Sequence, residues 1–339
     1  MTNIFQDKSI LVTGGTGSIG SEIVRKLLQC EPRVVRILSN DENGLFNLEH
    51  ELRGGPRVRL LIGDVKDKQR LQRAIEGIDF VFHAAALKHV PLCEYNPFEA
   101  VQTNVLGTQN VIESAIEEEV DKFITLSTDK AVNPINVMGA TKLLAERLTV
   151  SANYHKGAKK TAFSCVRFGN VLDSRGSVVP LFREQIQNGG PVTITDPDMT
   201  RFVMSIPRAI DLVLEAAKMA EGGEIFIFKM PVFRISDLAE VAIEELAPHY
   251  GYTPQSIEVK IIGKRLGEKS YEELLTEDEA MYAYETEDMF IISQREENRG
   301  AREGAKARYT SRDGTLLTRE ELRKMLRENL PPWAAPPTY

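Results

Sequence analysis

The sequence predicts an α/β protein: a doubly wound parallel sheet of the Rossmann type with a second, smaller substrate-binding lobe. Three observations lead to this prediction. Apolar β-type runs alternate with stretches of helical spacing between Ser9 and Arg167, as in parallel sheets with crossover helices. A glycine-rich turn separates the first of these runs from the first helix. Polar residues follow several runs at the carboxyl end, the edge where open parallel sheets bind ligands.

Composition narrows the class of protein. The chain has 339 residues, 42% hydrophobic and 27% charged, which is long for one compact domain and favours a large domain plus a lobe. Its formal net charge of −7 argues against a general binder of nucleic acid or anionic membranes. No apolar run approaches the ~20 residues of a transmembrane helix, and the polar start from Met1 to Asp7 is no signal peptide. We expect a cytoplasmic protein without membrane insertion.

The cysteines predict neither a disulfide framework nor a metal site. Cys30, Cys93 and Cys165 are far apart and lack C-x-x-C spacing. Three widely separated thiols are typical of free cysteines in a reducing cytosol.

The first strand, Ser9 to Thr13, runs into the glycine-rich turn, and an amphipathic helix continues to Leu28. Glycine permits the tight turn and lets backbone amides approach a pyrophosphate, whose charge is favoured at a helix N-terminus. A plain glycine-rich turn is the alternative, but the strand before and the helix after favour a dinucleotide site. The candidate cofactor contacts are Gly14, Thr16, Gly17, Ser18, Ile19 and Gly20.

The second strand, Val34 to Leu38, ends where a carboxylate would hold an adenosine ribose. Ser39 and Asn40 can instead donate to a 2′-phosphate that a carboxylate would repel, and this favours NADP. The next residue, Asp41, has a carboxylate that can hold the adenosine ribose of NAD. Both cofactors therefore stay open.

Candidate cofactor contacts also follow the third and fourth strands. After Val58 to Gly63, Asp64 and Val65 are placed to contact the adenine, with an exposed loop aspartate as the alternative. The fourth strand, Asp79 to His83, leads into small residues that suit close passage of a cofactor. These are Ala84, Ala85 and Ala86.

Three further polar residues near the cofactor positions have open roles. His83 and His89 have the chemistry of acid/base groups, but a lone histidine beside a cofactor is more often a packing or hydrogen-bonding residue. Asn104, in the expected helix Phe98 to Ala115, is a candidate cofactor contact. It is otherwise a polar residue tied to backbone, or a surface residue.

The stretch after the fifth strand carries the catalytic candidates. The apolar run from Phe123 ends at Ser127, and Thr128, Asp129 and Lys130 follow in a loop. A helix then begins near Val137 and carries Lys142. In a loop the acid and the amine can turn toward one substrate, whereas an exposed ion pair is the alternative.

These segments together resemble the extended short-chain dehydrogenase/reductase family. More narrowly, they resemble the UDP-N-acetylglucosamine 4,6-dehydratases of surface-polysaccharide and protein-glycan synthesis. The resemblance covers nearly the whole chain, and the chain is similar to the short, soluble members. It is carried by Thr13 to Gly20, Asp64-Val65, His83 to Val90, Ser127 to Lys130 and Asn136 to Lys142.

The resemblance implies a lyase that forms a UDP-4-keto-6-deoxy-N-acetylhexosamine by internal hydride transfer. Lys130 is then the base that removes the C5 proton, if burial and the cation of Lys142 favour its neutral amine. Asp129 is the acid that expels the 6-hydroxyl, and Thr128 hydrogen-bonds the sugar. Lys142 holds the nicotinamide ribose. Relatives bind the nucleotide sugar at positions that match Lys88, Asn170, Arg201, Arg265 and Glu268, and they often assemble, so we expect a homo-oligomer.

Met138 departs from the wider family, which uses Tyr-x-x-x-Lys. Methionine stands where the tyrosine is expected, four residues before Lys142, as in some dehydratases of this branch. The base for the sugar 4-hydroxyl is therefore open: the charge of Lys142 can favour deprotonation nearby, and Thr128 and Asp129 are the local groups that can relay the proton. Two rival functions also stay open: a UDP-sugar 4-epimerase, which needs no Lys130 base, and a non-catalytic dinucleotide sensor.

The strands and helices expected after Thr161 indicate how the chain divides into two domains. A sixth strand, Thr161 to Arg167, precedes the lobe, and the helix Ile210 to Ala220 and the strand Glu224 to Phe228 return to the sheet. We therefore assign 1–170 and 206–234 to the dinucleotide-binding domain, and 171–205 and 235–339 to the nucleotide-sugar lobe. Within the latter we expect four elements: a helix over Tyr271 to Leu275, a strand over Met289 to Ile292, a charged loop over 295–308 and a helix over Thr318 to Glu328.

Overall fold

The computed structural model describes residues 3–293 and 307–329. The chain forms two compact units. The first comprises residues 1–167, 210–229 and 275–308, and the second comprises 168–209, 230–274 and 309–339. Most of the expected charged loop over 295–308 lies outside the described residues.

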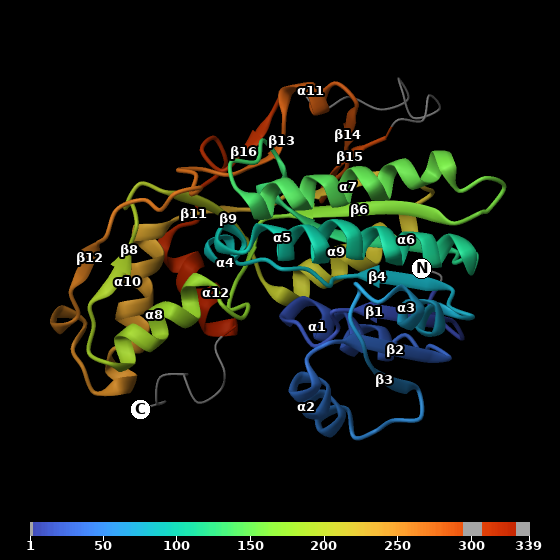
Figure 1. Cartoon of the computed structure of the whole chain (residues 1–339). Coiled ribbons are helices and arrows are strands. Elements are labelled where there is room, and N and C mark those ends of the chain that lie inside the picture. The colour runs from blue at the N-terminus through green and yellow to red at the C-terminus, as the bar shows by residue number, and fades with distance from the viewer. Residues whose placement is uncertain (1–2, 294–306, 330–339) are drawn as a thin grey trace. The chain divides into compact units, whose positions relative to one another are not determined.

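The first unit is built on a nine-stranded sheet in the described part of the chain. Parallel pairing joins β3, β2, β1, β4 and β5 in that order, which confirms the doubly wound parallel sheet (Figure 1). The strand order is β14-β15-β10-β6-β5-β4-β1-β2-β3. The bounds are β1 (Ser9–Thr13), β2 (Val34–Ser39), β3 (Val58–Ile62), β4 (Phe80–His83), β5 (Lys122–Thr128), β6 (Ala162–Phe168), β10 (Ile225–Phe228), β14 (Ala283–Glu285) and β15 (Met289–Ile292).

Helices connect these strands and pack on the sheet. On one face, buried residues of α3, α6 and α7 share a core with Phe123 and Phe163. The bounds are α1 (Ser18–Leu28), α2 (Glu42–Leu52), α3 (Lys68–Ile75), α4 (Val90–Tyr95), α5 (Pro97–Ala100), α6 (Gly107–Glu117), α7 (Val137–His155), α9 (Ile206–Met219) and α11 (Glu277–Ala280). The expected helix Phe98 to Ala115 is interrupted by the π-helical η1 (Val101–Leu106), and η2 (Asp129–Ala131) is a 3₁₀ turn after β5.

The structure corrects two sequence-based assignments near the C-terminus. Residues 275–308 belong to the first unit and not to the lobe, because the apolar β15 pairs antiparallel with β10 and extends the sheet. The segment Tyr271 to Leu275 is not a helix. It contains β13 (Glu273–Leu275), which pairs with β16 (Tyr309–Thr310); that pairing spans a long stretch of sequence, so local spacing does not reveal it.

The second unit packs three helices around small sheets. The helices are α8 (Val178–Gln187), α10 (Ile235–Leu246) and α12 (Arg319–Asn329). Besides the β13-β16 pair, its strands are β7 (Asn170–Val171), β8 (Val192–Ile194), β9 (Thr200–Met204), β11 (Val232–Arg234) and β12 (Val259–Ile261), in the orders β11-β9-β7 and β12-β8. Short 3₁₀ turns, η3 (Pro248–Tyr250) and η4 (Pro254–Ser256), lie between α10 and β12.

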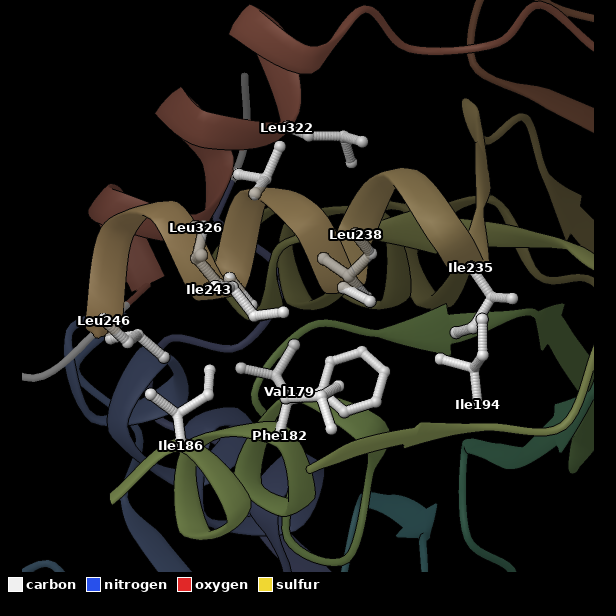
Figure 2. Packing of buried hydrophobic residues seen from close by; sticks show 14 of the residues in the cluster. Val179, Phe182, Ile186, Ile194, Ile235, Leu238, Ile243, Leu246, Leu322 and Leu326 are labelled. Atoms are coloured by element: carbon white, nitrogen blue, oxygen red, sulfur yellow. The ribbon is translucent and has the colours of Figure 1, made fainter. Parts of the chain in front are cut away.

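Apolar side chains from the three helices form the core of this unit (Figure 2). Phe182 of α8, Leu246 of α10 and Leu326 of α12 have no exposed surface. At the rim of the same packing, Arg327 donates to the Glu245 carboxylate, with an Nε to Oε2 distance of 2.6 Å. Nothing in residues 3–293 or 307–329 forms a helix with both the length and the apolar content needed to cross a bilayer.

Candidate active site

The glycine-rich turn brings three elements of the first unit into close contact. Gly14 has a φ of +64°, which favours glycine, and a Cβ there would lie 2.7 Å from the Ala85 Cα at the end of β4. A Cβ at Gly20 would clash with the Gly14 carbonyl oxygen. The helix α1 begins after Gly17 with no side-chain cap, so its first amides suit an anion such as a pyrophosphate.

The residues at the end of β2 bond to three neighbouring parts of the first unit: the glycine-rich turn, the loop after β3 and the first turn of α2. The hydroxyls of Thr16 and Ser39 are 2.8 Å apart, and the Asn40 amide donates to the Asp64 carboxylate over 3.0 Å. Asp41 caps α2, because its Oδ1 accepts from the Gly44 amide at 2.9 Å. The Asp41 carboxylate thus has a structural partner at the position where the sequence suggested a ribose contact.

Asn104 is buried, and its side chain binds the backbone of the segment after β4. Its side-chain oxygen accepts from the Leu87 amide at 2.8 Å, and its nitrogen donates to the Leu87 carbonyl oxygen at 2.9 Å. The same nitrogen donates to the Thr141 hydroxyl at 3.0 Å. Asn104 therefore joins this segment to α7.

His83 is held as a neutral imidazole. Thr108 donates its hydroxyl hydrogen to the Asn104 carbonyl oxygen over 2.7 Å, so its oxygen accepts from His83 Nε2, 2.9 Å away. His83 Nδ1 then accepts from the Thr13 hydroxyl at 2.8 Å. Burial, followed by the charge of Lys142, lowers the pKa of His83 to about 3. These contacts make His83 a hydrogen-bonding residue of the core.

The end of β5 places an acid and an amine side by side. Asp129 is completely buried, and its Oδ1 lies 2.9 Å from Lys130 Nζ. Thr128 donates its hydroxyl to the same oxygen over 2.9 Å. Asp129 Oδ2 is buried and has no hydrogen-bond partner among the described residues. A buried carboxylate oxygen in that state is suited to a ligand that donates a hydrogen bond.

The helix α7 carries the second lysine of the candidate site. Lys142 is 7% exposed, and its Nζ donates to the Leu126 carbonyl oxygen over 2.6 Å. Burial lowers the pKa of Lys142, although the Glu146 carboxylate opposes the shift. A Cβ at Gly139 would clash with the Lys130 carbonyl oxygen, so glycine lets the first turn of α7 lie against η2.

Met138 makes the site apolar at the position of the missing tyrosine. It is 3% exposed and packs with Cys93 and Ala100. A thioether has no proton to exchange. Position 138 therefore offers no group for proton transfer.

Of the expected substrate contacts, Lys88 is an exposed residue of the first unit and the others belong to the second. Arg201 is 7% exposed and donates to the carbonyl oxygens of Thr200 and Lys269, each over 2.8 Å. Glu268 accepts from the Arg265 amide at 3.1 Å, and the Arg265 side chain is exposed. Asn170 begins β7.

Sequence reasoning missed a buried ion cluster formed by Arg167, Glu146 and Glu279. Arg167 and Glu279 are 112 residues apart, and no local spacing connects them. It also gave no role to Ser127, whose buried hydroxyl has no hydrogen-bond partner among the described residues. A serine directly before the polar residues at the carboxyl end of β5 was the signal available for Ser127.

The parallel sheet, the glycine-rich turn and the lysine of α7 together define a dinucleotide-binding fold of the extended short-chain dehydrogenase/reductase class. The family model described as polysaccharide biosynthesis protein matches residues 10–294, and the chain belongs to that family. This confirms the resemblance found in the sequence.

Relatives of known sequence carry different names. The chain is 63% identical to "Uncharacterized membrane protein MJ1061" of Methanocaldococcus jannaschii, covering 97% of this chain and 98% of the relative. It is 46% identical to a "UDP-N-acetylglucosamine 4,6-dehydratase (inverting)" of Campylobacter jejuni, covering 86% and 84%. It is 42% identical to a "UDP-glucose 4-epimerase" of Rickettsia rickettsii, covering 85% and 84%. Among solved structures, Pen from Bacillus thuringiensis superposes with a TM-score of 0.91 at 48% identity, covering 96% and 99%.

Proposed function

We propose that the protein is a UDP-N-acetylglucosamine 4,6-dehydratase that forms a UDP-4-keto-6-deoxy-N-acetylhexosamine for surface glycan synthesis. The observation that carries the proposal is the Asp129–Lys130 pair, in which a fully buried carboxylate touches an amine that is 23% exposed. An elimination needs one group that accepts a proton and one that donates it to the leaving oxygen. The Campylobacter relative with the dehydratase name supports the same assignment.

A bound nicotinamide dinucleotide would supply the hydride chemistry, as acceptor of a hydride from C4 of the sugar and donor of a hydride to C6. The glycine-rich turn at the start of α1 is proposed to hold its pyrophosphate. We propose NADP, because Ser39 and Asn40 carry donor groups that suit a 2′-phosphate. All three residues also have partners within the protein: Ser39 bonds Thr16, Asn40 bonds Asp64 and Asp41 caps α2. NAD is the alternative. Lys142 is proposed to hold the nicotinamide ribose.

Asp129 and Lys130 are joined by a hydrogen bond of 2.9 Å. The elimination uses the neutral form of this pair, in which Asp129 is the acid and Lys130 the amine. Lys130 is then the free amine from the start, and Asp129 takes up its proton from the sugar 4-hydroxyl while C4 is oxidised. In the neutral form Lys130 removes the C5 proton while Asp129 protonates the departing 6-hydroxyl, which leaves as water. Lys130 then returns its proton to C5.

Asp129 must receive the proton that later leaves with water, and Thr128 offers a route for it from the sugar 4-hydroxyl. Its hydroxyl donates to Asp129 Oδ1 over 2.9 Å. Thr128 can pass its proton to Asp129 while it accepts the proton of the sugar 4-hydroxyl. This relay needs no tyrosine at position 138. The proton count then balances, because the 4-hydroxyl proton that Asp129 receives is the one that departs in water, and Lys130 returns a proton to C5 for the one that it removed.

For the nucleotide part of the substrate, Arg265 is the stronger arginine candidate. Arg201 already donates to backbone carbonyls, whereas the Arg265 side chain is exposed. Guanidinium groups suit phosphate oxygens and carboxylates suit ribose hydroxyls, so we propose Arg265 for the diphosphate and Glu268 for the ribose. Lys88, Asn170 and Arg201 are kept as further candidates.

The family resemblance further supports a cytoplasmic homo-oligomer as the proposed form of the protein. Cell fractionation tests the location, because one relative is named a membrane protein. Sedimentation of the purified chain tests the assembly.

The direct test of the proposed function is mass spectrometry of UDP-N-acetylglucosamine after incubation with the purified protein. A product lighter by one water supports the dehydratase. The second candidate is a UDP-sugar 4-epimerase, favoured by the name of the Rickettsia relative. It would give a product of unchanged mass and altered C4 configuration.

A further inference from the structure

Arg167 forms the centre of a buried ion cluster in the first unit. Its side chain is 1% exposed. The guanidinium binds Glu146 through Nε and NH2, over 3.0 and 2.7 Å. It binds Glu279 through NH1 and NH2, over 2.9 and 3.0 Å. Two carboxylates thus share one guanidinium in a double bidentate arrangement, which fixes all three side chains.

The cluster reaches Lys142 through Glu146. The two residues are four apart on α7 and so lie on the same helix face. The charged or titratable side chains that act on Lys142 or on its cluster are Glu146, Cys165, Arg167, His83, Glu279 and Arg147. His83 is neutral, and burial raises the pKa of Cys165, so its thiol is neutral too. Apart from the exposed Arg147, the two carboxylates then balance the charges of Arg167 and Lys142.

Glu279 is the member of the cluster that comes from the C-terminal segment of the first unit, residues 275–308. It lies on the short helix α11, where Thr276 and Glu279 form a capping box. Burial raises the pKa of Glu279, but the charge and hydrogen bonds of Arg167 outweigh this effect and hold it below its usual value. Glu279 is therefore a carboxylate at neutral pH, and its side chain is 17% exposed. Its negative charge offsets the second of the two cations.

We propose that Glu279 is a positioning residue for Lys142: it holds Arg167, which fixes Glu146 one helical turn from the lysine, and its charge completes the neutral cluster. The inference rests on the proposed function only in taking Lys142 as a cofactor-binding group. It extends the site to a C-terminal segment that no motif in the sequence connects with it.

The test compares Glu279→Gln with Glu279→Asp, which keeps the charge, and with Glu277→Gln, an exposed control on the same helix. The dissociation constants of NADP and NAD are measured across a pH series with the purified full chain. In Glu279→Gln the cluster keeps one uncompensated positive charge, so Lys142 loses its proton at lower pH. We expect binding to weaken about threefold to tenfold, and its alkaline decline to begin about one pH unit lower.

The outcomes separate the possible explanations. We expect Glu279→Asp to recover most of the affinity and Glu277→Gln to behave as the unmodified protein. A Glu279→Gln variant that only melts at lower temperature, with an unchanged pH profile, would overturn the positioning role. An unmodified protein that binds neither dinucleotide would instead overturn the proposed function, and this inference with it.

Discussion

The amine of Lys130 lies 2.9 Å from the carboxylate oxygen Oδ1 of Asp129, a residue with no exposed surface. The second carboxylate oxygen is buried with no hydrogen-bond partner in the described part of the chain. A surface ion pair would have both groups hydrated and would contribute little. Here the burial of one partner argues against an ordinary loop ion pair and favours a role in binding or catalysis.

The first prediction concerns Lys130. Replacing it with methionine keeps the apolar stem but removes the amine that takes the C5 proton. We expect dehydratase turnover to fall by about 10²–10⁴-fold, the usual contribution of a general base, while the dissociation constant of the dinucleotide stays the same. Steady-state kinetics and a binding titration measure the two effects. Lys159→Met, at a distant lysine paired with Glu119, serves as the control; equal turnover in both variants would remove Lys130 from the mechanism.

The second prediction concerns the proton relay through Thr128. Thr128→Val preserves the shape of the side chain but removes the hydroxyl that donates to Asp129. We expect oxidation at C4 to slow by about 10²-fold or more, measured as slower appearance of the reduced dinucleotide in a single turnover. Thr128→Ser keeps a hydroxyl and should restore most of the rate. If the valine and serine variants are equally slow, the threonine acts by packing and not by proton transfer.

The third prediction concerns the glycine-rich turn. A methyl group at Gly20 would meet the Gly14 carbonyl oxygen, and neither backbone segment can move without displacing α1. We expect Gly20→Ala to lower the free energy of unfolding by about 1–3 kcal/mol and to weaken dinucleotide binding. Gly55→Ala is the matched control, because the nearest atom to its Cβ would be 3.8 Å away. Denaturant titrations that gave the two variants the same stability would contradict this interpretation of the turn.

The fourth prediction is a pH dependence of stability. The pKa of His83 is lowered from 6.5 to about 3 in the folded protein. Between about pH 6.5 and pH 3 the unfolded chain therefore binds a proton at His83 that the folded chain does not bind. The contribution of neutral His83 to the free energy of unfolding is complete above about pH 6.5, and it is lost as the pH falls toward 3. The loss amounts to about 1.4 kcal/mol for each pH unit.

His83→Gln should remove this dependence. Between about pH 4 and pH 6 the free energy of unfolding should change less steeply with pH than in the unmodified protein. His155→Gln, at an exposed histidine, should leave the slope as it was. The slopes are compared and not the absolute stabilities, because the glutamine also alters the bonds to Thr13 and Thr108. Parallel slopes in all three proteins would mean that His83 is not held neutral.

The parts of the fold that depend on local pattern were predictable from sequence. The strand at Ser9, the turn that follows it and the polar end of β5 are each marked by neighbouring residues, and the parallel sheet follows from their alternation with helices. The family resemblance added the assignment of roles to Asp129, Lys130 and Lys142, which remain proposals.

The parts that depend on distant partners were not predictable. Asp41 remains a candidate ribose contact by its position, but its sequence position did not reveal that its Oδ1 accepts from the backbone amide three residues ahead. The apolar run at β15 gave no sign that its partner is β10. In the same way, Arg167 and Glu279 are joined only by the tertiary fold. Tertiary packing decides which of several possible partners a side chain binds, and a single sequence does not show that packing.

The most direct measurement is to incubate the purified protein with UDP-N-acetylglucosamine in deuterated water and to follow the products by NMR. Removal of the C5 proton by Lys130 and its return from solvent predict a 4-keto-6-deoxy sugar with deuterium at C5. UDP-N-acetylgalactosamine without deuterium at C5 would contradict the dehydratase and identify an epimerase. Unchanged substrate, with a dinucleotide still bound to the protein, would contradict both and favour a sensor or another substrate.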